Sequence, residues 1–254
     1  MISFTAADIE VWLAAFLYPF LRILALMSSA PLFSHESVPV MVRIGLAFGI
    51  TFVVSAALPA APFVSPFSVA GMVLVFQQVL VGLAIGLAMQ LVFAAVTLAG
   101  DLIGLQMGLS FAAFVDPLNA EQTPLVGGFL SLILMLVFLA INGHLALIAA
   151  MVDSFTVMPV GPTGWKALDA MRLVSAGGGL FATGVAISLP VVGALLLVNL
   201  TLGVLTRTAP QLNLFAVGFP VTLAVGLVML LLAMPFALPA LQQALERGLA
   251  LLLR

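Results

Sequence analysis

Six long apolar runs, separated by short connectors that contain prolines or polar residues, fill most of the 254-residue sequence. They cover residues 9–30, 40–58, 69–99, 125–152, 173–205 and 214–241. A helix needs about 20 apolar residues to cross a bilayer, and backbone polar groups in lipid must be bonded within the protein. The runs are continuous, whereas strands of a membrane barrel alternate. The sequence therefore predicts an all-α, integral membrane-type protein with about six long apolar helical segments, in a single domain over residues 1–254.

Ionisable side chains are scarce. Nine acidic and seven basic residues make up 6% of the chain, against about 25% in soluble domains. With 64% hydrophobic residues, the composition excludes a soluble globular enzyme and a disordered chain. It also excludes nucleic acid as a partner, because no basic face is available to neutralise phosphates. We expect membrane lipid or other apolar protein to surround the chain.

The sequence offers no recognisable catalytic or metal-binding motif. His35 and His144 lie in different parts of the chain, and neither has a second histidine at helical spacing. Asp101 and Asp116 are fifteen residues apart and flank sequence that resembles a loop. The absence of cysteine removes thiol nucleophiles and thiolate metal ligands. We therefore expect a non-enzymatic protein with no catalytic residue, no metal site and no cofactor.

Arg22 is a charged residue deep in the first apolar run. A transporter of ions or small solutes places ionisable groups at such depths on its substrate path. The structural alternative is that Arg22 pairs with a helix-end carbonyl, a glutamine or an acid, or belongs to a partner interface. The sequence favours the structural alternative.

Glycines recur at a spacing that allows close helix packing. The spacing occurs at Gly45 and Gly49, at Gly82 and Gly86, and at Gly100, Gly104 and Gly108. Glycines four residues apart expose backbone on one helix face, so that another helix can approach closely. The spacing does not distinguish packing within the chain from packing against other subunits.

Residues 100–124 combine glycines, a proline and large apolar side chains. Gly104, Gly108 and Pro117 are expected to weaken a helix here. The large apolar side chains of Phe111 and Phe114 are costly to leave in water. The segment must therefore be buried against other groups, or it must fill a space such as a pore. One interpretation is a pore plug that moves when substrate passes. The other is a re-entrant or interfacial loop without a moving part.

The order and spacing of several motifs resemble the FliR/SctT family of type III export-gate proteins over nearly the whole chain. These are Arg22 with Pro31, Val38-Pro39 with Arg43, the run from Val81 to Gly86, Asn142-Gly143-His144, Ser154 with Pro159 and Gly161, and Arg207-Thr208-Ala209-Pro210-Gln211-Leu212-Asn213. The last motif is the most specific. In one departure, Gln77 and Gln78 stand where the family often has a glutamate, so a role that requires a negative charge there is not expected.

The resemblance implies a single-copy subunit of the export gate at the base of the flagellum or the injectisome. Such a subunit assembles with FliP-type and FliQ-type subunits into a conical channel for unfolded export substrate proteins, beside FlhB-type and FlhA-type subunits. It would lie in the bacterial inner membrane, at the flagellar basal body in the flagellar case. A stand-alone transporter of small solutes is the alternative from another functional class.

The resemblance also assigns roles to residues. The loop matching Gly104 to Pro117 would plug the closed channel, with Gly108 and Val115 in it and with Phe111 and Phe114 as the stoppers. Helix packing or assembly would depend on Gly82, Gly86, Arg207, Pro210, Gln211 and Asn213. The apolar segments would form bent hairpins that pack on partner subunits.

Overall fold

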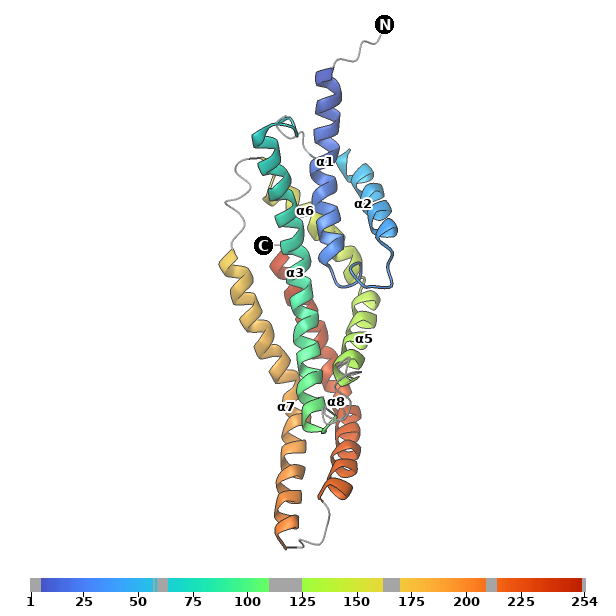
Figure 1. The fold of residues 1–254 in the computed structure, drawn as a ribbon, viewed down its shortest axis with the longest axis vertical. Helices are drawn as coiled ribbons and strands as arrows, with labels where there is room; N and C mark the ends of the chain where they lie inside the picture. The colour runs from blue at the N-terminus through green and yellow to red at the C-terminus, as the bar shows by residue number, and fades with distance from the viewer. Residues whose placement is uncertain are drawn as a thin grey trace. The chain divides into compact units, whose positions relative to one another are not determined.

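In a computed structural model of the chain, residues 6–56, 58, 64–109, 125–161, 170–208 and 214–252 are described. The regular structure of these residues is helical throughout, which confirms the all-α prediction (Figure 1). The helices are α1 (Ala6–Ser29), α2 (Val40–Ser55), α3 (Val69–Gln106), α5 (Leu125–Ala140), α6 (Gly143–Val157), α7 (Ala170–Thr208) and α8 (Leu214–Leu252).

Four stretches in these helices are long and apolar enough to cross a membrane. They are Glu10–Ser29, Val69–Gln106, Gly177–Thr208 and Val217–Gly248, and the bent pair α5 and α6 brings the number of candidate spans to five. With 16 residues, α2 is about 24 Å long, which is shorter than the roughly 30 Å of a bilayer's hydrocarbon core. The six apolar runs therefore correspond to four or five candidate spans and one shorter helix.

The chain divides into two compact units, and α3, α7 and α8 each contribute to both. The first unit contains residues 1–91, 142–176 and 247–254, and the second contains residues 92–141 and 177–246.

Helix α1 is the centre of the first unit. It lies side by side with α2 (Figure 1), where the rings of Phe16 and Phe48 are 5.0 Å apart. The Tyr18 hydroxyl donates a hydrogen bond to the carbonyl oxygen of Val64, at 2.9 Å. On other faces α1 contacts α6 and the first part of α3 through the residues of the candidate site.

The second part of α3 is the centre of the second unit. Against α5, the rings of Phe93 and Phe138 meet edge to face at 6.1 Å. The hydroxyls of Thr97 and Ser131 share a hydrogen bond of 2.7 Å across the same contact. Helices α7 and α8 also pack on this part of α3, as the glycine contacts described below show.

Helix α3 continues beyond the expected boundary at residue 99, because its glycines are packing positions as well as weak helix formers. It runs through Gly100 and Gly104 to Gln106, so the expectation of loop-like sequence from residue 100 is wrong for this part. A methyl group placed on Gly100 would lie 2.5 Å from the backbone nitrogen of Gly127. The contact with α5 that this glycine permits stabilises the helix locally.

The expected fourth run, residues 125–152, is interrupted at Asn142. This residue has a left-handed backbone conformation, with φ 57° and ψ 29°, which ends α5. Its carbonyl oxygen then accepts hydrogen bonds from the backbone N–H groups of Leu145 and Ala146, in the first turn of α6. Asparagine tolerates this conformation better than most residues do, which explains why the break falls here.

Helix α8 includes the expected sixth run, residues 214–241, and continues beyond it. It passes through Pro235 and Pro239 to Leu252. Each proline removes one backbone donor from the helix. The turns that follow are nevertheless held by the burial of Leu241, Ala244 and Leu245.

Candidate functional site

The candidate site in the first unit is a polar cluster around the guanidinium of Arg22, which is fully buried. Its Nε donates a hydrogen bond to Oε1 of Gln78 at 2.8 Å. One terminal nitrogen donates to Oγ of Ser154 at 3.0 Å, and the other donates to the carbonyl oxygen of Met158 at 2.8 Å. These bonds connect α1 to α3, to α6 and to the residue that follows α6.

The environment of the Arg22 charge consists of neutral acceptors, a helix end and an aromatic ring. Met158 is the C-cap residue of α6, so the cation lies at the negative end of that helix dipole. The guanidinium carbon also lies 4.0 Å from the centre of the Phe155 ring, a cation–π geometry. Arg22 therefore pairs with a glutamine and a helix-end carbonyl, as the structural alternative expects.

Sequence reasoning missed Phe155, and it identified Ser154 only through the resemblance. Ser154 is 132 residues from Arg22 in the chain, so no spacing rule connects them. The chemical signal that was available is the arginine itself, because a buried guanidinium requires several acceptors. Which residues supply them depends on the packing of α6 against α1.

Gly82 and Gly86 lie where α3 meets α1, beside this cluster. A methyl group on Gly82 would overlap the backbone oxygen of Arg22 and lie 2.8 Å from Cβ of Ala25. A methyl group on Gly86 would overlap the hydroxyl of Ser29 and lie 3.0 Å from the backbone nitrogen of Ala30. These glycines therefore serve packing within the chain.

Glycines with the same spacing in α2 have no such neighbours. Nothing in the described part of the chain lies within 4 Å of a methyl group placed on Gly45 or Gly49. Identical sequence patterns thus mark a close contact in one helix and an open face in another.

In the second unit, α7 also approaches α3 closely at a glycine. A methyl group on Gly184 of α7 would overlap the backbone oxygen of Ala95.

Two of the glycines expected in the plug lie at the end of α3. Gly104 is inside the helix, and Gly108 has a φ of 81°, a conformation that favours glycine. The other predicted plug residues, Phe111, Phe114, Val115 and Pro117, lie outside the described residues.

The predicted assembly motif begins at the end of α7. Arg207 is exposed in the last turn of this helix, where a cation is favourable. Pro210, Gln211 and Asn213 lie outside the described residues.

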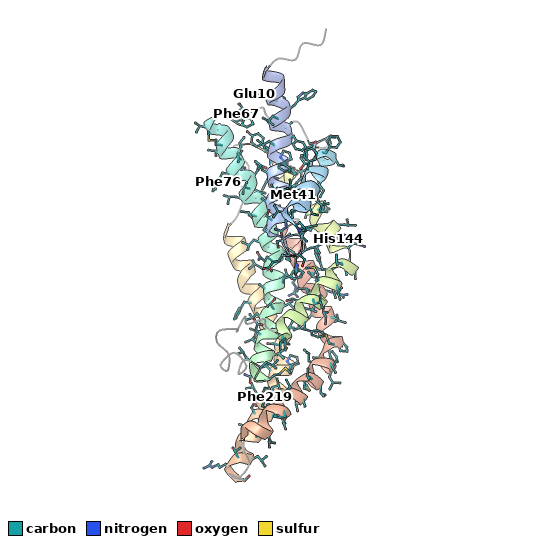
Figure 2. All side chains as sticks on the ribbon, turned by 45° about the vertical axis from the view of Figure 1, so that its right-hand side comes forward. Glu10, Met41, Phe67, Phe76, His144 and Phe219 are labelled. Atoms are coloured by element: carbon teal, nitrogen blue, oxygen red, sulfur yellow. The ribbon has the colours of Figure 1, made fainter. Side chains whose placement is uncertain are left out.

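Titratable side chains do not form a metal-binding cluster among the described residues: no group of three or more His, Asp or Glu could hold an ion there. Nδ1 of His35 accepts a hydrogen bond from the backbone N–H of Ser37 at 3.2 Å. His144 follows the break between α5 and α6, and its Nδ1 has no hydrogen-bond partner in the described part of the chain (Figure 2).

The chain leaves much apolar surface uncovered. In the first unit, 83% of Met41 and 73% of Phe67 are exposed, and Phe76 is exposed as well (Figure 2). In the most apolar window of Val217–Gly248 only 11% of the residues are buried, against 56% for Val69–Gln106. Lipid or partner helices must cover these surfaces, because large apolar patches are rarely left in water.

Comparisons with known proteins give a consistent result. The family described as "Bacterial export proteins, family 1" matches residues 13–248. The flagellar biosynthetic protein FliR of Escherichia coli K12 is 44% identical over 239 residues, which are 94% of this chain and 91% of that protein. The FliR of Pectobacterium carotovorum is 42% identical with the same coverage. The FliR of Bacillus subtilis is 37% identical over 87% of this chain and 86% of that protein.

Proposed function

Because this chain belongs to the FliR family of bacterial export proteins, we propose that it is a subunit of the flagellar type III protein export gate. Together with FliP-type and FliQ-type subunits it forms a channel for unfolded export substrates. FlhB-type and FlhA-type subunits are its neighbours, and its place is the bacterial inner membrane at the flagellar basal body. The observation that carries the proposal is identity of 42% and 44% to proteins named flagellar biosynthetic protein FliR, over 94% of the chain.

Family membership makes the chain a membrane-embedded transport component and not an enzyme. This confirms the expectation of a non-enzymatic protein, and the family match confirms the resemblance seen in the sequence. The injectisome alternative is less well supported, because the relatives described above are flagellar proteins. That the chain is one domain stays a prediction, which the match of one family to residues 13–248 supports.

The sparse burial of the apolar helices supports a shared channel. A transporter that works alone is expected to place charged or polar pairs at mid-membrane along its path. Here the buried cation Arg22 donates its hydrogen bonds to neutral groups, and these bonds hold helices together. The Arg22 side chain is therefore unsuited to line a substrate path. The exposed apolar side chains offer partner helices a large surface.

Extraction in a mild detergent tests the proposal directly. We expect affinity-tagged chain to co-purify with FliP-type and FliQ-type subunits, because partner helices would cover its exposed apolar faces. Mass spectrometry of the purified material identifies the subunits. Recovery of the chain as a monomer that transports a small solute in vesicles would support the stand-alone transporter instead.

Residues Gly104, Gly108, Phe111, Phe114, Val115 and Pro117 are proposed to form the segment that plugs this channel. Deletion of residues 111–114 is expected to let small ions leak through the assembled gate, because the bulky apolar side chains are then lost. Conductance of the purified complex in planar bilayers measures the leak, and complex yield serves as the control. An unchanged conductance at normal yield would show that the plug assignment is wrong.

We also propose that Gly82, Gly86, Arg207, Pro210, Gln211 and Asn213 serve helix packing and assembly. For Gly82 and Gly86, the close approach of α1 and α3 supports this role. For the other four, the support is the resemblance of the Arg207–Asn213 connector to the family motif.

A further inference from the structure

Asp101 is a carboxylate within α3, in the second unit. Its Oδ1 is buried and has no hydrogen-bond partner in the described part of the chain. The residue as a whole is only half-buried, so it lies at the edge of the packed helices. A buried acceptor without a donor is costly in an apolar medium, and an ionised carboxylate without a cation is costlier still. Asp101 therefore needs a partner beyond those that the described residues supply.

The hydroxyl one turn earlier on α3 is already in use. Oγ1 of Thr97 donates to the carbonyl oxygen of Phe93 at 3.0 Å and lies 2.7 Å from Oγ of Ser131 in α5. The Ser131 hydroxyl then donates to Thr97, since each hydroxyl has a single proton. These two hydroxyls therefore hold α3 and α5 together and have no proton left to donate to Asp101.

The basic residue of the second unit is too far from Asp101 to pair with it. The sequence of this unit contains one basic residue, Arg207, which is in the last turn of α7. Helices α3 and α7 run in the same direction in this unit (Figure 1), and Nδ2 of Asn199 donates to Oε1 of Gln106 at 3.5 Å. Asp101 lies five residues before this contact and Arg207 lies eight residues after it, so about 20 Å of helix rise separates them. An arginine side chain cannot span that distance.

One face of α3 around Asp101 is left open. Close contacts at glycines cover the other faces: Gly127 of α5 approaches Gly100, Gly184 of α7 approaches Ala95, and Gly226 of α8 approaches Met107. Ala94, Leu98, Asp101 and Leu105 are four, three and four residues apart, which places them on one side of the helix. Ala94 and Leu105 are exposed, and Leu98 is half-buried. We call these four residues the open face of α3.

We propose that Asp101 is a docking point for a lysine or arginine on an apolar helix of another subunit, which covers the open face of α3 in the assembled gate. Charge complementarity carries this inference. Lipid tails match the alanine and the leucines of the face, but they cannot pair with a carboxylate, whereas an apolar helix with one basic residue matches both. The inference rests on the proposed function, because it assigns one residue of this chain to a contact between gate subunits.

Asp101→Asn tests the docking point, because it keeps the shape of the side chain and removes its charge. We expect the yield of FliP-type and FliQ-type subunits that co-purify with the tagged chain to fall about tenfold, since the partner's cation would lose its counter-charge at a buried position. Asp101→Glu keeps the charge and should retain more of the yield. Asp153→Asn is the matched control, because it removes an exposed carboxylate of α6. A yield for Asp101→Asn equal to that of the control would overturn the inference.

A charge exchange identifies the partner residue. Asp101→Lys should abolish assembly, because two cations would then meet at one buried position. In this background, each lysine and arginine in the apolar helices of the other gate subunits is replaced with glutamate in turn. We expect one of these replacements to restore the complex. If none does, or if only changes within this chain restore it, the proposed partner helix is wrong.

A photoreactive benzophenone amino acid in place of Leu105 tests the open face without changing Asp101 or any charge. In the assembled gate we expect it to crosslink to another gate subunit, which mass spectrometry of the crosslinked peptide identifies. Crosslinks to lipid or to this chain alone would show that no partner helix covers the face. This measurement decides if Asp101→Asn lowers the amount of folded chain in the membrane.

The same purifications distinguish this inference from the proposed function. If the parent chain and Asp101→Asn co-purify equally well with FliP-type and FliQ-type subunits, the proposed function stands and the docking point fails. If the parent chain co-purifies with neither type of subunit, the proposed function itself is wrong.

Discussion

Replacement of Arg22 with methionine is expected to lower the free energy of unfolding by about 3–5 kcal/mol. Methionine fills much of the same volume but donates no hydrogen bond. It would leave Oε1 of Gln78 without its donor at a buried position and would remove donors from Ser154 and Met158. A buried polar group without a partner costs more than the bond itself contributes.

Denaturant unfolding in detergent micelles, followed by circular dichroism, measures this change. Arg22→Lys should fall between the parent and the methionine variant, because an ammonium keeps the charge but cannot direct donors to three separated acceptors as a planar guanidinium does. Arg22→Met combined with Gln78→Leu should recover part of the loss, since both partners then become apolar. If Arg22→Met is as stable as the parent, the hydrogen bonds contribute nothing and the site has another purpose.

Replacement of Gly82 with leucine is expected to destabilise the first unit by about 3 kcal/mol and to lower the yield of assembled gate sharply. The first carbon of the new side chain would overlap the backbone oxygen of Arg22, so α1 and α3 would have to separate. Separation would also stretch the hydrogen bond between Arg22 and Gln78, which spans the same two helices. Backbone cannot move aside as a flexible side chain can.

The yield of purified complex, together with unfolding of the chain in detergent, measures the effect. Gly45→Ala is the control: it adds a methyl group to a helical glycine with nothing described within 4 Å, so the chain's own stability should stay the same or rise by about 1 kcal/mol. If Gly82→Leu and Gly45→Ala behave alike, the approach of α1 to α3 does not matter for folding. A fall in complex yield for Gly45→Ala alone, with normal stability of the chain, would place a partner helix on that face of α2.

The helices themselves were predictable from the sequence, but some of their limits were not. The run from residue 69 was expected to end near its glycines, yet Gly100 and Gly104 lie inside α3 because the helix packs at Gly100 against Gly127. Helix α8 likewise continues past the expected end of its run at residue 241, although Pro235 and Pro239 lie shortly before that point. Local propensity competes with packing at such positions, and packing prevails where the helix face is buried.

The candidate site was only partly predictable. Arg22 was identified from the sequence because a charge within an apolar run must be satisfied somehow, and the structural alternative correctly named a glutamine and a helix-end carbonyl as possible partners. The identity of those partners was hidden, because they are 56 and 136 residues away in the chain. Phe155 carried no sequence signal, since an aromatic residue in an apolar helix is ordinary.

The sequence alone determined that this chain is helical and membrane-embedded, because so few charges cannot solvate its surface and an apolar medium requires backbone groups to bond within each segment. Only the tertiary structure decided which glycines are contacts: Gly82 and Gly86 meet α1, whereas Gly45 and Gly49, at the same spacing, face nothing described. The physical reason is how far apart in the sequence the interacting residues lie. Helical hydrogen bonds join residues four apart, so the local sequence encodes them. A contact between two helices joins residues that are far apart in the chain, and its energy depends on the shapes of both helix surfaces.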